Sequence, residues 1–297
     1  MPAAIDDSVA YEAGRKGNGS MKTRILSALV GIVVLLGVLF CPLTWVFSVA
    51  AAILAMIAVW ELLRNTGLVS RNGLVLCAML FAGLEVLSCS YAEQLYAAHF
   101  ICGWLPLILL VGFTLVVTMM IVEERCDVTK SVGVRAWVFT LYGTLGFVAL
   151  ARLRLMQDGL AYVLLPLVIS WMSDTGAYFT GYFFGKHKMA PVISPKKTWE
   201  GFFGGWVVSV GCAALFGVAY QAVAGVTLAV SPLWMVALAL PLAPLSVCGD
   251  LLASRIKRRY GIKDYGTIMP GHGGVMDRFD SVVMIAPILW ILLWLFA

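Results

Sequence analysis

The sequence predicts an all-α membrane protein, a polytopic bundle of about eight or nine transmembrane helices with its N-terminus in the cytoplasm. Composition is the first observation: of the 297 residues, 61% are hydrophobic and 12% are charged, whereas soluble domains have about 25% charged residues. The second is a series of long apolar runs, and the third is an uneven distribution of Lys and Arg among the loops between them. Together they exclude a soluble globule, and the short basic segments offer no extended face for nucleic acid.

The predicted spans are runs that approach the length of about 20 apolar residues that crosses a bilayer. They are 25–41, 43–63, 74–90, 99–122, 134–151, 160–184, 203–224, 228–250 and 280–297. The first run is short, and Pro42 at its junction with the second is also compatible with a re-entrant hairpin. Residues 1–20 are polar and predicted to be a disordered extension, after which Met21-Lys-Thr-Arg reads as an alternative start.

The distribution of Lys and Arg among the loops predicts how these spans are oriented in the membrane. With a cytoplasmic N-terminus, 19 of the 21 Lys and Arg residues fall on the cytoplasmic side, and only Arg152 and Arg154 lie opposite. The longest cytoplasmic loops are then 185–202 and 251–279. We therefore divide the chain into N-terminal helices, 21–160, and a C-terminal set, 161–297, that carries both loops.

Three acidic residues lie in or beside predicted spans. Asp174 lies deep in a span, where an ionisable group costs several kcal/mol and needs a polar cavity or a partner. It is either part of a helix–helix hydrogen bond or a ligand for a metal or substrate. Glu61 stands three residues before Arg64 and is interpreted as half of an interfacial ion pair, and Glu85 is interpreted as structural.

The first loop contains the motif Ser194-Pro-Lys-Lys-Thr-Trp-Glu-Gly201. Pro195 suits the first position of a helix capped by Ser194, and the free backbone N–H groups of such a helix favour anions. Lys196 and Lys197 would add positive charge for phosphate oxygens. Alternatively, both lysines only orient the spans, and Glu200 responds to the dipole of the following helix.

The second loop and its flanks concentrate the remaining charged groups. Asp250, Ser254, Lys257 and Arg258 share one face of a helix that leaves the membrane. They are followed by Lys263-Asp264, the glycine turn Pro270-Gly-His-Gly-Gly274, and Asp277-Arg278-Phe-Asp280. Hard carboxylate oxygens suit Mg²⁺, and nearby cations neutralise phosphate oxygens. The pattern therefore favours a Mg²⁺–polyphosphate site.

The same motifs resemble the signature of CDP-diacylglycerol synthases, also called phosphatidate cytidylyltransferases. The resemblance covers residues 254–280 and, as a second block, 194–201; Met269 departs from the family's usual Leu or Ile. It implies that CTP and phosphatidate react, with Mg²⁺, to give CDP-diacylglycerol and pyrophosphate. It also implies a homodimer in the bacterial cytoplasmic membrane, with the active site facing the cytoplasm and the catalytic helices within 161–297.

The resemblance also implies roles for individual residues. Asp250 and Asp277 would bind the metal, in a paired centre that extends to a monovalent ion such as K⁺, and Asp174 and Asp280 would join the same cluster. Catalysis is assigned to Asp250, Asp277, Lys196, Lys197 and Arg278. Substrate binding is assigned to Ser194, Ser254, Lys257, Arg258, Lys263, His272, Gly273 and Gly274.

Two other functions are compatible with parts of the pattern. A CTP-dependent kinase of a polyprenol-type lipid alcohol would use the same nucleotide, but it would need a base for the hydroxyl proton. An ion-coupled transporter would also have buried acids and glycine-broken spans. Phosphatidate needs no strong base, because its phosphate has a second pKa of about 6 and is already an anion.

Overall fold

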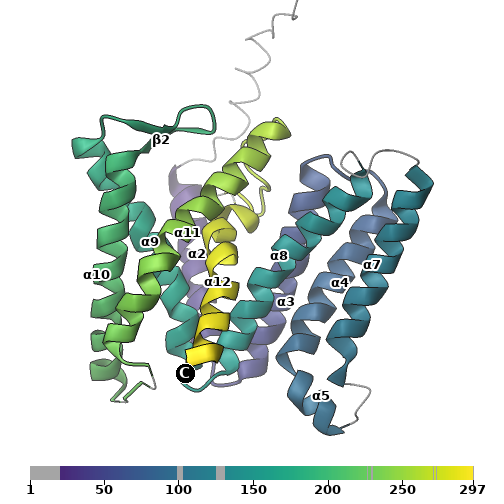
Figure 1. The fold of residues 1–297 in the computed structure, drawn as a ribbon, viewed down its shortest axis with the longest axis horizontal. Helices are drawn as coiled ribbons and strands as arrows, with labels where there is room; N and C mark the ends of the chain where they lie inside the picture. Colours follow the sequence, from purple (N-terminus) through teal and green to yellow (C-terminus); the bar gives the residue numbers. More distant parts are fainter. Residues whose placement is uncertain are drawn as a thin grey trace, which may run out of the picture.

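The computed structural model describes residues 21–98, 103–124, 131–225, 227–228, 230–269, 271 and 273–296, which form a helical bundle with one small hairpin (Figure 1). The predicted extension 1–20, Pro270 and His272 lie outside these ranges. The N-terminal elements are α2 (Met21–Leu39), α3 (Thr44–Trp60) with its π-helical continuation η1 (Glu61–Asn65), α4 (Asn72–Ser90), α5 (Ala92–Ala98), α7 (Leu105–Glu124) and α8 (Val132–Leu155). The C-terminal elements are α9 (Gly159–Phe184), β1 (Lys188–Ala190), β2 (Ser194–Thr198), α10 (Trp199–Ala224), α11 (Pro232–Arg259) and α12 (Met276–Phe296).

Each of the nine predicted spans overlaps a described helix, and residues 99–102, 229 and 297 of these spans lie outside the described ranges. Within the described ranges, seven helices, α3 with η1, α4 and α8 to α12, are long and apolar enough to cross a membrane. The apolar stretches of α2 and α7, Leu29–Leu39 and Leu105–Met119, are shorter. The fold class is therefore confirmed, with the two-stranded hairpin as its only described sheet.

The helix ends differ from the predicted ones around both cytoplasmic loops. Helix α11 continues beyond the predicted span end at residue 250 to Arg259, which confirms the prediction that Asp250, Ser254, Lys257 and Arg258 lie on one helix. Its last turn places Lys257, Arg258 and Arg259 at the negative end of the helix dipole, where cations are favourable. Helix α12 begins at Met276 rather than residue 280. The connection between them is consequently 260–275, shorter than the predicted loop 251–279.

Helices α9 and α10 pack tightly along their length beside α11. The contact depends on glycine, since a Cβ added at Gly205 would meet the Ser173 carbonyl oxygen and one at Gly201 would meet that of Ala177. Gly181 faces Thr198 in the same interface. This is the close approach that small residues permit between membrane helices.

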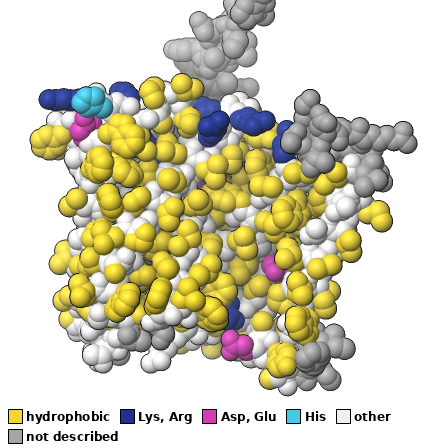
Figure 2. Space-filling model, in the orientation of Figure 1, with side chains coloured by type: hydrophobic (Ala, Val, Ile, Leu, Met, Phe, Trp, Pro, Cys, Tyr) yellow, Lys and Arg dark blue, Asp and Glu magenta, His cyan; other side chains and the backbone are white. Residues whose placement is uncertain are grey.

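Charged groups are concentrated at one end of the molecule. Figure 1 shows the β1–β2 hairpin, the end of α11 and the start of α12 at the same end, with the C-terminus at the other. On the face shown in Figure 2, apolar side chains cover the middle of the bundle and most Lys and Arg side chains line the hairpin end. The fold thus brings the two predicted functional loops together at the rim of an apolar body.

Candidate active site

The first cluster joins the hairpin to α11. Lys197, at the end of β2, places its Nζ atom 2.6 Å from Oδ2 of Asp250. Ser254, one turn further along α11, donates its hydroxyl to Oδ1 of the same carboxylate over 3.3 Å. The i, i+4 relation predicted for Asp250 and Ser254 is therefore confirmed, and the carboxylate binds one cation and one hydroxyl.

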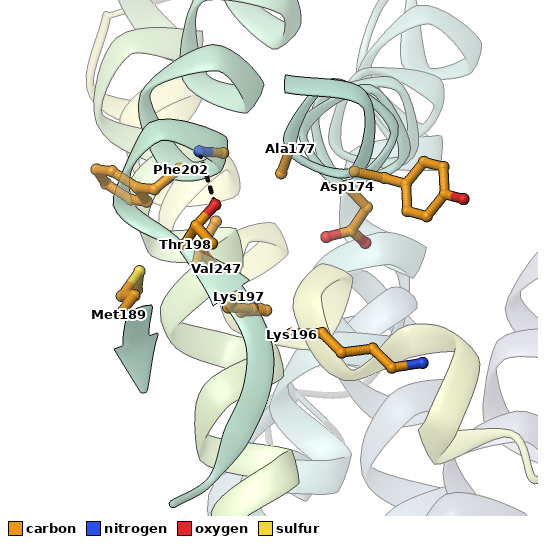
Figure 3. A pocket seen from close by; sticks show the side chains of 10 residues that line it. Asp174, Ala177, Met189, Lys196, Lys197, Thr198, Phe202 and Val247 are labelled. Atoms are coloured by element: carbon orange, nitrogen blue, oxygen red, sulfur yellow. Dashed lines mark hydrogen bonds between the residues drawn. The ribbon is translucent and has the colours of Figure 1, made fainter. Parts of the chain in front are cut away.

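The Lys197 cluster borders a cavity of about 180 Å³. Figure 3 shows the Asp174 carboxylate and the side chains of Lys196 and Lys197 at this cavity. The rest of the lining is mostly apolar and consists of Ala177, Tyr178, Met189, Thr198, Gly201, Phe202 and Val247. Asp174 is thus exposed to a cavity between α9 and the hairpin, which meets the requirement for a polar environment at its depth. Such a mixed lining suits a molecule with an anionic head and an apolar body.

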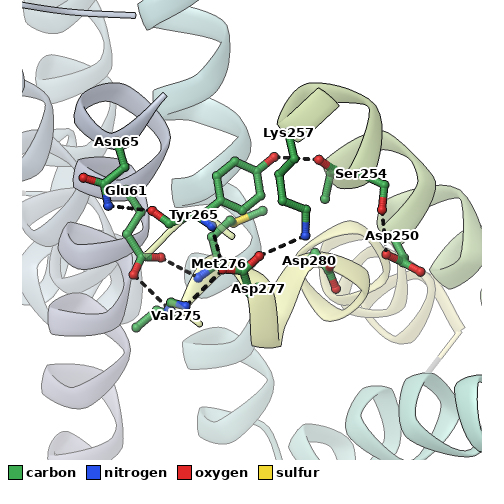
Figure 4. A network of polar contacts seen from close by, with 12 residues as sticks. Glu61, Asn65, Asp250, Ser254, Lys257, Tyr265, Val275, Met276, Asp277 and Asp280 are labelled. Carbon is green, nitrogen blue, oxygen red and sulfur yellow. Dashed lines mark hydrogen bonds and ion pairs between the residues drawn. The ribbon is translucent and has the colours of Figure 1, made fainter. Parts of the chain in front are cut away.

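The second cluster centres on Asp277, at the start of α12 (Figure 4). Its Oδ1 atom lies 2.9 Å from Nζ of Lys257, and both side chains are almost fully buried, at 3% and 12% exposure. Its Oδ2 atom accepts backbone N–H groups from Tyr265 at 2.7 Å and Gly274 at 3.0 Å. The Lys257 ammonium also lies 5.3 Å from the centre of the Tyr265 ring, in cation–π geometry. Asp277 therefore links α11, the 260–275 connection and α12.

Asp280 lies between the two clusters. Its Oδ1 atom accepts the backbone N–H of Ser281 at 2.7 Å, and Asp250 and Asp174 are close enough to repel its charge, while Lys257 attracts it. Tyr142 of α8 donates its hydroxyl to the Asp280 backbone carbonyl at 3.3 Å. Three of the four predicted metal ligands, Asp174, Asp250 and Asp280, are therefore electrostatic neighbours.

The remaining predicted site residues occupy the same end of the bundle. Arg258, Lys263 and Arg278 are exposed, Gly273 is half-buried and Gly274 is buried. Gly273 has φ +85°, a conformation that favours glycine, so the predicted glycine turn is present there. The roles assigned to these residues remain predictions.

The predicted helix start at Ser194 is wrong. Residues Ser194–Thr198 form strand β2, with Ala190 opposite Ser194 and Lys188 opposite Thr198. Helix α10 begins only at Trp199, where the Thr198 side chain accepts the Gly201 N–H. The motif therefore presents its two lysines from a strand. The pairing partner of that strand lies outside the motif, so local sequence signals favoured the cap at Ser194.

The predicted ion pair between Glu61 and Arg64 is wrong. The Arg64 guanidinium donates to the Ser70 carbonyl, and the Glu61 carboxylate instead accepts the backbone N–H groups of Val275 and Met276. Like Asp174, Glu61 is an acidic residue within an apolar run. Arg64 nearby in the sequence offered a local partner for Glu61, whereas the actual partners are 214 and 215 residues away in the chain.

The donor set is compatible with Mg²⁺ supplied together with a nucleotide. Among the residues described, no three His, Cys, Asp or Glu side chains form a ready-made metal site. Protein-bound Mg²⁺, however, usually uses one or two carboxylates and completes its shell with waters and substrate phosphates. Asp250 and Asp277 each already bind a lysine ammonium, so both are placed to hold a cation.

Fold and site together define a polytopic membrane protein with a lysine- and aspartate-rich site at one end of its helices. Sequence comparison identifies the family: the profile of the cytidylyltransferase family matches residues 22–296, and the chain belongs to this family. It is 32% identical to the phosphatidate cytidylyltransferase of Bacillus subtilis (strain 168), over 93% of this chain and 99% of the relative. It is 34% identical to the phosphatidate cytidylyltransferase of Staphylococcus aureus (strain COL), over 92% and 99%.

Proposed function

We propose that this protein transfers the CMP group of CTP to phosphatidate, giving CDP-diacylglycerol and pyrophosphate for phospholipid synthesis. The observation that carries the proposal is the match, over nearly the whole chain, to phosphatidate cytidylyltransferases. The Lys197–Asp250 and Lys257–Asp277 pairs at the end of an apolar bundle support it, because they supply charge where a lipid phosphate and a soluble nucleotide can meet.

In this reaction a phosphate oxygen of phosphatidate attacks the α-phosphorus of CTP. The bond from the α-phosphorus to the oxygen that bridges the α- and β-phosphates breaks, and pyrophosphate leaves with the electron pair of that bond. The nucleophile is already an anion near neutral pH, so the chain needs no strong general base. Its main task is to bring two anions together in line, which positioned cationic side chains accomplish.

The lysines divide this task according to their positions. Lys196 and Lys197 border the cavity, whose other lining residues are apolar apart from Asp174 and Thr198, and they would bind the lipid phosphate or the triphosphate there. Lys257, Arg258, Lys263 and Arg278 would bind phosphate oxygens from the α11–α12 side. Ser194, Ser254, Gly273 and Gly274 would complete the substrate contacts.

Asp250 and Asp277 would hold Mg²⁺, with Asp174 and Asp280 beside it and K⁺ as a second ion. The metal ion supplies positive charge for the phosphate oxygens when it is bound. Further parts of the proposal are a cytoplasmic active site in the bacterial inner membrane and a homodimeric assembly.

The test uses purified protein in detergent, phosphatidate, CTP labelled with ³²P at the α-phosphorus, and Mg²⁺, with and without EDTA. We expect label in the lipid phase, equimolar pyrophosphate, and loss of both with EDTA that excess Mg²⁺ reverses. Label recovered as CDP when a polyprenol is supplied would instead establish the kinase. Absence of both products from a folded sample would refute nucleotide chemistry and leave transport. Transfer that persists in EDTA would refute the metal requirement alone.

A further inference from the structure

Glu61 is a buried acidic residue inside the bundle, and the proposed reaction assigns no role to it. It begins η1 at the end of α3, and its side chain is 0% exposed. Its Oε1 atom accepts the Val275 N–H at 3.0 Å, and its Oε2 atom accepts the Met276 N–H at 2.8 Å (Figure 4). These donors lie at the start of α12, where backbone N–H groups lack helical partners and the helix dipole favours negative charge.

The contact lies directly beside Asp277. Three successive N–H groups, those of Gly274, Val275 and Met276, are shared between two carboxylates: Asp277 takes the first and Glu61 takes the other two. The backbone that presents Asp277 is thus held from within by its own side chain and from outside by a residue of the N-terminal helices.

A second contact from η1 reaches the 260–275 connection at Tyr265. Asn65, the last residue of η1, donates its Nδ2 to the Tyr265 carbonyl at 2.5 Å. The N–H of Tyr265 in turn donates to Asp277 Oδ2 at 2.7 Å. Glu61 and Asn65 therefore contact both backbone segments that surround the Asp277 carboxylate.

The Glu61 carboxylate packs directly against the backbone of Gly266 and Gly274. A Cβ at Gly266 or at Gly274 would lie against its Oε1 atom. Close packing of this kind fixes a side chain in one position, since any displacement must move the surrounding backbone.

From these contacts we infer that Glu61 is a positioning residue for cytidylyl transfer. It holds the Gly274–Asp277 turn so that Asp277 faces Lys257, and it touches neither substrate. The activity readout of this inference rests on the proposed function, so its test includes a measurement that does not.

The principal variant is Glu61→Gln, which keeps the size of the side chain. Its amide group would direct an N–H toward a backbone N–H, so only one of the two hydrogen bonds can form. Loss of a group that orients a site residue typically lowers activity by about 10- to 100-fold. We expect a fall of that size in kcat, KM values for CTP and phosphatidate within about threefold of wild type, and unchanged membrane yield.

The matched control is Glu85→Gln, which also removes a buried carboxylate from a membrane helix. Glu85 lies on α4, and its described contact is to Cys89 of the same helix. We expect its kcat to stay at the wild-type value. Equal losses in both variants, or a Glu61→Gln enzyme with wild-type kcat, would overturn the inference.

Hydrogen–deuterium exchange of the peptide covering 265–277 gives the independent readout. We expect exchange about tenfold faster in Glu61→Gln than in wild type or Glu85→Gln, because one of the Val275 and Met276 amides loses its acceptor and the turn is held less firmly. Unchanged exchange would overturn the positioning role. If wild type transfers no CMP, the proposed function fails while this measurement still tests the contact.

Should Glu61→Gln fail to fold, Asn65→Ala provides the same test from the neighbouring contact. It removes the hydrogen bond to the Tyr265 carbonyl without removing a charge. We expect a smaller fall in kcat, about threefold to tenfold, with KM unchanged. A folded Asn65→Ala enzyme with wild-type kcat and wild-type exchange would overturn the inference.

Discussion

Two lysine–aspartate pairs give the site its charge pattern, and their surroundings differ. Lys257 and Asp277 are almost excluded from solvent, whereas Lys197 and Asp250 are about one-quarter exposed, and Lys197 borders the cavity. A buried pair depends strongly on both partners, because removing one leaves the other charge without compensation. In an accessible pair, the lysine can bind an incoming anion, or the aspartate an incoming cation, in place of its present partner at a lower free-energy cost.

Asp277→Asn is expected to abolish turnover while leaving membrane insertion intact. Asparagine cannot form the ion pair with Lys257, and its amide group would oppose the backbone N–H of Tyr265 or Gly274. The measurement is CMP transfer by purified enzyme at matched yield. Asp264→Asn, an exposed acid in the same connection, is the control and should retain activity. Appreciable transfer by Asp277→Asn would remove this residue from the catalytic site.

Lys196→Ala is expected to raise the apparent KM for an anionic substrate about tenfold, because one charge is lost from the cavity wall. Steady-state kinetics with CTP and phosphatidate varied separately would identify which substrate is affected. Lys188→Ala removes the same charge from the other strand of the hairpin, outside the cavity lining, and should leave both KM values unchanged. An unchanged KM in Lys196→Ala would leave that lysine with only a topological role.

Among the elements, the hairpin and the start of α10 decide how the lysines are presented. In a strand, successive side chains point to opposite faces. Lys196 and Lys197 both line the cavity, although only Lys197 reaches Asp250. Thr198 ends the strand and begins the helix, and its buried side chain also lies against Gly181 and Gly201. Thus one residue anchors the hairpin to both α9 and α10.

Thr198→Ala is expected to lower the free energy of unfolding by about 1 kcal/mol, the usual cost of losing a helix N-cap. The lost interaction is the hydrogen bond from the Gly201 N–H to the threonine hydroxyl. Equilibrium unfolding in mixed micelles measures this change in the free energy of unfolding. Thr198→Ser keeps the hydroxyl and should lose less than half as much; equal losses for both variants would assign the effect to the methyl group and its packing.

For the whole molecule, the two ends of the bundle differ in charge, and this difference sets the expected orientation. The hairpin and both functional loops lie at one end, and the chain ends at the other (Figure 1). Positive residues are retained on the cytoplasmic side during insertion. The end with the site is therefore expected to face the cytoplasm, where CTP is available.

Single cysteines in the hairpin turn that precedes α10 and in the last turn of α10 test this orientation in a background without the seven native cysteines. Val192, in the hairpin turn, and Val223, in the last turn of α10, are each 90% exposed. Val192→Cys should react with a membrane-impermeant maleimide only in inside-out vesicles, and Val223→Cys only in right-side-out vesicles. The reverse pattern would place the site on the outer face. Labelling of both from one side would show that α10 does not span the membrane.

The approximate positions of the long apolar helices and the family could be obtained without coordinates, whereas the short helix α5 was not predicted and only seven of the nine predicted spans are described as long and apolar enough to cross a membrane. Hydropathy accumulates along each segment independently of its neighbours, so a run such as 43–63 identifies its own span. The charged signature also lies within a short stretch, 254–280, and Asp250 and Ser254 share a helix face at a spacing that needs no tertiary information.

Tertiary structure decided the pairings and the local forms that depend on distant partners. Ser194–Thr198 is a strand because Lys188–Ala190 lies beside it, although its own residues favour a helix cap. Glu61 holds the start of α12 rather than pairing with Arg64, because folding brings η1 against a turn more than 200 residues away. A carboxylate accepts whichever donors the packed chain places next to it, and that choice is a property of the assembled bundle, not of the local sequence.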